Sequence, residues 1–133
     1  MKIWAVLTVF TLVMAVPDTA QAEMAFKQQN ELKLFQYYAQ ASCLATAFTE
    51  GGIYDQAVSA LNGYREFGAM PLEAYEALIA PIQQWLQKDY ATQAGKQNNL
   101  MKCIDFAESE QLAEIFRVQS EALKNHPRTE ASV

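Results

Sequence analysis

Apolar residues return every three or four positions along most of the chain after Asn30, and this spacing predicts amphipathic helices. The first predicted helix begins at Glu31. The glycine pair Gly51-Gly52 is expected to stop it, because glycine readily takes the left-handed backbone of a helix end. Cys43 lies beside the apolar stripe. One buried face is expected, formed by Leu34, Tyr37, Tyr38, Ala41, Leu44, Ala45 and Phe48.

Two more helices are expected in the middle of the chain. The second runs over about 55–67 and ends at Gly68, a candidate C-terminal cap. The third opens at Pro71 and continues to about residue 88. Pro81 lies inside it, and an internal proline clashes with the carbonyl four residues back. The third helix is therefore predicted to be kinked, with the bend near Ala80.

The C-terminal part predicts two helices separated by a break at Ser109. Asn98 and Asn99 are candidate caps for a short helix over 100–107, and Ser109 caps the last one, with Glu110 in its first turn. No segment shows the two-residue alternation of a strand. The predicted fold class is therefore all-α, a small bundle of about five helices. The residues expected to be buried here are Leu100, Cys103, Ile104, Phe106, Leu112, Ile115, Phe116 and Leu123.

The first 22 residues have the layout of a cleaved secretory signal peptide. A basic start is followed by 14 uncharged residues, 3–16, and then by the small-x-small site Ala20-Gln21-Ala22. A membrane anchor is the alternative, although 14 apolar residues are short for a bilayer. The expected domain runs over 23–125, followed by a disordered polar tail at 126–133.

Cys43 and Cys103 both lie in the part that would be exported. Two cysteines in an oxidising compartment are most simply interpreted as one disulfide, here closing a loop of 60 residues. Two free thiols are the alternative. A thiol nucleophile is disfavoured because it needs a nearby base, and the sole histidine, His126, lies in the polar tail.

The net charge of −5 argues against nucleic acid and anionic membrane surfaces as partners. No metal-ligand spacing and no glycine-rich phosphate loop appears, so no metal or cofactor is expected. Glu108, Glu110 and Glu114 have the pattern of a solvated helix face rather than of paired catalytic carboxylates. An enzyme is therefore disfavoured, and a protein that binds a partner is expected.

The longest polar interruption of the domain is DYATQAGKQNN, residues 89–99. Gly95 favours a turn there. Connections of this length in a small domain are often functional, although a plain solvated loop fits the composition as well.

Three segments together resemble a known family. They are YYAQASCLATAF (37–48), YREFGAMPLEAYEAL (64–78) and LMKCIDFAESEQLAEIF (100–116), and with the loop ahead of Leu100 they cover most of 31–118. Their order and spacing are similar to those of the immunity proteins that protect bacteria from type VI secretion amidase effectors, in the fourth amidase–immunity family. The internal Pro81 departs from that pattern.

The resemblance implies a periplasmic, non-catalytic helical homodimer. Such a protein binds its cognate effector, a papain-like cysteine amidase that cuts peptidoglycan stem peptides, as a heterotetramer and obstructs the active-site groove. The alternatives are another periplasmic helical protein-binding or chaperone-like module and, third, a periplasmic enzyme. Family members use a helix and a loop for the contact, and the matching positions here are Pro71, Glu73, Tyr75, Tyr90, Gln93, Lys96, Gln97 and Asn98.

Overall fold

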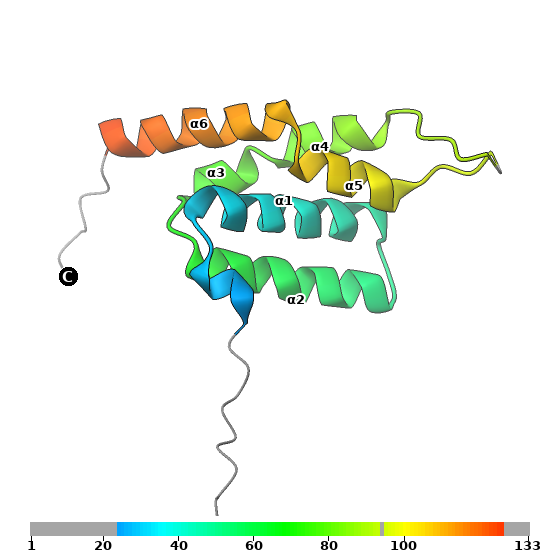
Figure 1. Ribbon diagram of the computed structural model, residues 1–133, viewed down its shortest axis with the longest axis horizontal. Coiled ribbons are helices and arrows are strands. Elements are labelled where there is room, and N and C mark those ends of the chain that lie inside the picture. Colours follow the sequence, from blue (N-terminus) through cyan, green and yellow to red (C-terminus); the bar gives the residue numbers. More distant parts are fainter. Residues whose placement is uncertain (1–23, 94, 127–133) are drawn as a thin grey trace, which may run out of the picture.

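Helix α1 (Glu31–Ala47) runs through the middle of the fold (Figure 1). Helix α2 (Gly52–Phe67) returns antiparallel along one side, and α4 (Ile79–Leu86) and α5 (Asn99–Ala107) cover the other side. The structure, a computed structural model, describes residues 24–93 and 95–126. The signal peptide predicted for 1–22 and the tail from 127 onward lie outside these residues.

The other helices lie toward the end of the bundle where α1 begins (Figure 1). They are the 3-10 helix η1 (Ala25–Gln28), α3 (Leu72–Glu76) and α6 (Glu110–Asn125). Among the residues that the structure describes, the regular elements are all helices, which confirms the all-α prediction. None of these helices is long and apolar enough to cross a membrane.

Helix α1 is buried on two faces, and the prediction of one buried face was wrong. Phe35, Ala39 and Cys43, which lie outside the predicted stripe, are the most deeply buried residues of the helix. Tyr37 and Leu44, which lie in the stripe, are only half-buried. The reason is the central position of α1, because α2 packs on one side of it and α5 on the other.

The glycine pair begins α2 and does not end α1. Helix α1 ends at Ala47, and the N–H of Phe48 donates to the Leu44 carbonyl (2.9 Å). Gly51 is the N-cap of α2 and has φ +83°, a backbone that favours glycine. Helix α2 therefore starts three residues before the predicted Asp55.

The predicted kink is confirmed, but it lies at Ala77–Leu78, between α3 and α4, and not at Ala80. Pro81 would clash with the carbonyl four residues earlier in a continuous helix, and that carbonyl belongs to Ala77. With the break placed there, Pro81 falls in the first turn of α4, where backbone N–H groups lack a partner inside the helix. Pro71 is the N-cap of α3 and not its first residue.

The predicted disulfide joins Cys43 of α1 to Cys103 of α5, with the two Cα atoms 5.4 Å apart. Both cysteines are fully buried, and they lie in the main apolar cluster with Phe35, Phe106 and Leu112. The bond therefore ties the central helix to the layer that covers it.

The buried face of α5 differs from the predicted one. Cys103 and Phe106 are fully buried as expected, but Leu100 and Ile104 are 50% and 44% exposed. The side of α5 that meets α1 carries residues spaced by one and four, which is the pattern of one helix face. These residues are Lys102, Cys103, Phe106 and Ala107.

Ser109 caps α6, as predicted, and its removal should lower stability. Its Oγ accepts a hydrogen bond from the Leu112 N–H (3.1 Å) and donates to the Phe106 carbonyl (2.7 Å). We expect Ser109→Ala to lower the free energy of unfolding by about 1 kcal/mol, measured by urea denaturation. Ser59→Ala, on the exposed face of α2, is the matched control and should change it little. Equal losses in both variants would contradict the capping role.

Candidate partner-binding surface

The connection between α4 and α5, here called loop 89–98, projects beyond the ends of the helices (Figure 1). Its two legs pair at an isolated antiparallel bridge between Ala91 and Gln97. The N–H of Thr92 donates to the Lys96 carbonyl (2.9 Å), and the N–H of Gly95 donates to the Thr92 carbonyl (2.8 Å). Gly95 has φ +74°, so glycine suits this turn. The two legs of the loop are therefore held together by backbone hydrogen bonds.

Side chains at the base of the loop also bond to one another. The amide of Gln97 donates to the Asp89 Oδ1 (2.6 Å) and accepts from the Tyr90 N–H (2.8 Å). The Ala91 N–H donates to the same Asp89 oxygen (3.1 Å). These hydrogen bonds from Gln97 and Ala91, aided by the charge of Lys102, hold the pKa of Asp89 below its usual range. Gln97 therefore joins the two legs.

The lowered pKa of Asp89 predicts how the loop responds to acid. A carboxyl group whose pKa is lower in the folded state stabilises that state above its unfolded pKa, here 3.8, and the contribution is lost as the pH falls through the folded value. We expect the amide signals of Ala91 and Gln97 to be constant from pH 7 to about pH 5 and to shift together below about pH 4.

NMR titration of the Asp89 carboxyl carbon alongside these amides measures the effect. Asp89→Asn is the control, because it removes the ionisable group and should abolish the coupled shift. Amide shifts that persist in this variant would assign the transition to another group.

Three of the five loop residues predicted to contact a partner are engaged inside the protein. Gln97 joins the legs, and the Asn98 Oδ1 caps α5 by accepting from the Met101 N–H (3.0 Å). The Tyr90 hydroxyl donates to Asp105 Oδ2 (3.0 Å), and desolvation together with this carboxylate raises the pKa of Tyr90. Gln93 and Lys96, near the turn, are exposed to solvent, and Gln97 is exposed as well, although its amide bonds to Asp89 and Tyr90.

The helix start predicted as the second contact lies at the opposite end of the bundle from loop 89–98 (Figure 1). Pro71 and Glu73 border a hollow of about 320 Å³ between α3 and the end of α6, where His126 also lies. Tyr75 is only 6% exposed, and its ring packs 4.4 Å from the ring of Tyr38. Tyr75 therefore supports α3 from the core and offers little surface.

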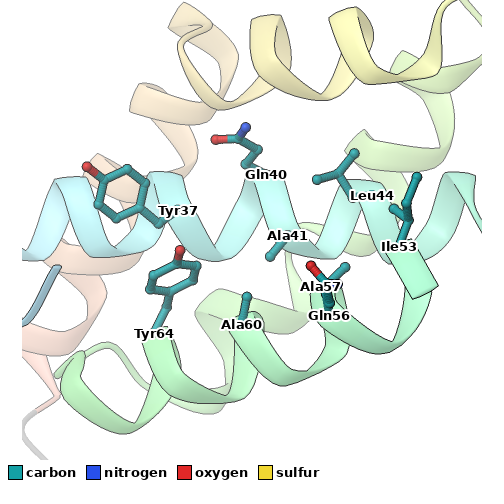
Figure 2. A pocket seen from close by; sticks show the side chains of 9 residues that line it. All are labelled: Tyr37, Gln40, Ala41, Leu44, Ile53, Gln56, Ala57, Ala60 and Tyr64. Atoms are coloured by element: carbon teal, nitrogen blue, oxygen red, sulfur yellow. The ribbon is translucent and has the colours of Figure 1, made fainter. Parts of the chain in front are cut away.

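Two features of the surface were not anticipated from the sequence. A groove of about 390 Å³ runs between α1 and α2, with no charged side chain in its lining; Tyr37 and Tyr64 stand at one end, and Leu44 and Ile53 at the other (Figure 2). On α5, exposed apolar side chains lie directly after the loop. These are Leu100, Met101 and Ile104.

Several contacts at the loop base were also missed, and the sequence offered no signal for them. Asp89, Lys102 and Asp105 are ordinary charged residues in a helical or loop pattern, and only the folded chain brings them together. Within 24–93 and 95–126, no three His, Cys, Asp or Glu side chains are grouped so that they could hold a metal ion.

Comparison with known proteins adds to this geometry. Residues 33–116 match the sequence model of Tai4, described as type VI secretion system (T6SS), amidase immunity protein. No curated protein matches the chain. Two solved structures resemble the fold over 71% of this chain. The first is the effector–immunity system Tae4/Tai4 from Salmonella typhimurium, with a TM-score of 0.65, 24% sequence identity and 94% of that chain covered. The second is the type VI effector–immunity complex Tae4-Tai4 from Enterobacter cloacae, with a TM-score of 0.64, 16% sequence identity and 97% of that chain covered.

Proposed function

Because the chain belongs to the Tai4 family of type VI secretion system amidase immunity proteins, we propose that it binds a cognate amidase effector and occupies its active-site groove. Occupation of the groove would keep peptidoglycan peptides away from the catalytic cysteine of the effector. The immunity protein then acts by binding alone, without catalysis of its own.

The observation that carries this proposal is the projecting, internally bonded loop on a stapled frame. Loop 89–98 is separated from the end of α4 by two residues and ends at α5, and α5 is tied to α1 by the buried disulfide. A loop that is already ordered loses less conformational freedom on binding, and this favours affinity. The exposed amide of Gln93 and ammonium of Lys96 supply hydrogen-bond donors suited to a polar groove.

A dimer accounts for the second predicted contact. The start of α3, which carries Pro71 and Glu73, lies at the opposite end of the bundle from the loop, so one protomer does not present both to the same small groove. We propose a homodimer in which one protomer contributes the loop and its partner the start of α3. The complex with two effector molecules is then a heterotetramer.

The proposed location is the periplasm, where the effector would meet the cell wall. The leader over 1–22 has the layout of an export signal, and a buried disulfide suits an oxidising compartment. Fractionation of cells that produce the full chain, with mass measurement of its N-terminus, tests both export and cleavage near Glu23.

Inhibition of the amidase encoded beside this gene is the direct test. The purified chain, added at a one-to-one ratio, is expected to abolish release of peptides from purified peptidoglycan and to co-elute with the amidase in size-exclusion chromatography. Full amidase activity in a fivefold excess of the chain would refute the proposal.

A further inference from the structure

Lys102 is the one buried charged residue within the described ranges 24–93 and 95–126. Its side chain is 3% exposed, although it belongs to a residue type that is almost never fully buried without compensation. An ammonium group taken out of water is costly unless hydrogen bonds or opposite charge replace its hydration. The contacts of Lys102 therefore indicate what its burial serves.

The first contact is with the end of α4. The Lys102 Nζ donates a hydrogen bond to the carbonyl of Leu86 (2.9 Å), the last residue of that helix. The last carbonyls of a helix have no partner within it, and they form the negative end of its dipole. The ammonium of Lys102 therefore gives a hydrogen-bond partner to a carbonyl at the end of α4, where the chain leaves this helix for the loop.

The second contact is with the first leg of the loop. The Lys102 Nζ lies 6.0 Å from the centre of the Tyr90 ring, at the edge of cation–π range. Tyr90 is also held by its hydroxyl to Asp105 and by its N–H to Gln97. The positive charge of Lys102 also acts on the carboxylate of Asp89. Lys102 thus interacts with Leu86, Asp89 and Tyr90, which follow one another along the chain from the end of α4 into the loop.

The position of Lys102 on α5 is itself rigid. It directly precedes Cys103, whose disulfide joins α5 to α1. On its other side, its N–H closes the first turn of α5 on the Asn98 carbonyl (3.2 Å). Because the disulfide and the first turn of α5 fix the backbone of Lys102, its side chain can hold the loop in a constant position relative to the core.

We infer that Lys102 is a positioning residue, whose buried ammonium holds the base of loop 89–98 against the end of α4 so that Gln93 and Lys96 are presented to the amidase. The inference rests on the proposed function for the identity of the partner. The ordering of the loop itself concerns the free protein and is measured without the amidase.

Hydrogen exchange of single amides, followed by NMR in the free protein, tests the inference. Lys102→Met keeps an apolar stem of similar length and removes the ammonium. We expect exchange at Thr92 and Gly95 to rise about tenfold, with exchange of the α1 amides unchanged. Lys124→Met, at an exposed position of α6, is the matched control and should alter neither. In the inhibition assay, Lys102→Met should weaken inhibition about tenfold at equal folded concentration.

Unchanged loop exchange in Lys102→Met would overturn the inference. So would an equal rise at the α1 amides, since that result would show only a general loss of stability. If the wild-type chain inhibits the amidase and Lys102→Met inhibits equally well, positioning for the partner is refuted. If the wild-type chain does not inhibit at all, the proposed function fails, while exchange still decides whether Lys102 orders the loop.

A second variant keeps the test decisive if Lys102→Met does not fold. Tyr90→Leu removes the ring that faces the ammonium and the hydroxyl bound to Asp105, at a half-buried position outside the helices. The same rise in exchange at Thr92 and Gly95 is expected, with the helices intact. Unchanged exchange would show that the loop base is not held through Tyr90, and the inference would fall.

Discussion

Replacing both Cys43 and Cys103 by alanine is expected to lower the free energy of unfolding by about 4 kcal/mol. The disulfide closes a loop of 60 residues, and its loss lets the unfolded chain regain the conformational freedom that this closure removes. Because both sulfur atoms lie in the fully buried cluster with Phe35 and Phe106, the smaller side chains also leave space in the core. Urea denaturation followed by circular dichroism measures the change.

A reducing agent provides the control for the disulfide variant. Reduction should destabilise the wild-type chain by a similar amount, and it should leave the alanine variant unaffected. If the alanine variant unfolds at the same urea concentration as the oxidised wild-type chain, closure of the loop contributes nothing. Loss of helix content before urea is added would instead show that the domain needs the bond to fold.

Replacing Gln93 and Lys96 together by alanine is expected to weaken inhibition of the amidase by on the order of 100-fold. Both side chains are exposed near the turn of loop 89–98. In the proposed complex they enter a polar groove. Their replacement by alanine would leave polar groups of that groove buried without a hydrogen-bond partner, which costs binding free energy. Inhibition constants and the circular dichroism spectrum are measured together, and the spectrum should not change.

The matched control replaces the same two residue types on another surface of the protein. Gln111→Ala with Lys124→Ala removes one exposed amide and one exposed ammonium from α6 and should leave inhibition unaltered. Unaltered inhibition by the loop variant would place the contact elsewhere, with Pro71 and Glu73 on α3 as the next surface to test. Gln97 is left intact because its amide bonds to Tyr90 and Asp89, and its loss would disturb the turn itself.

The course of the helices followed from short-range rules. Ser109 and Asn98 cap the helices that follow them, and Pro81 breaks the third helix, because each effect acts within about one helical turn. The exact break at Ala77 could have been derived from the same rule, since the carbonyl four residues before Pro81 is the one that clashes. The pairing of Cys43 with Cys103 needed only the count of cysteines and an oxidising compartment.

The candidate surface was predictable only as a segment. Its polar composition and length distinguish residues 89–99 along the chain. Which of its side chains face a partner depends on where their hydrogen-bonding groups are already used. Gln97 and Asn98 looked like donors for a partner, yet both are engaged within the fold, which leaves Gln93 and Lys96.

Residue types and spacings of a few residues were enough to predict the all-α class, the caps at Asn98 and Ser109, a kink in the third helix, the disulfide and the family. Other features became visible only in the folded chain: α1 is buried on two faces, Lys102 is buried beside the loop base, and the start of α3 lies at the opposite end of the bundle from loop 89–98. These features arise from contacts between residues distant along the chain. No local pattern encodes such contacts, since a helix face is the same in sequence whether one neighbour or two will cover it.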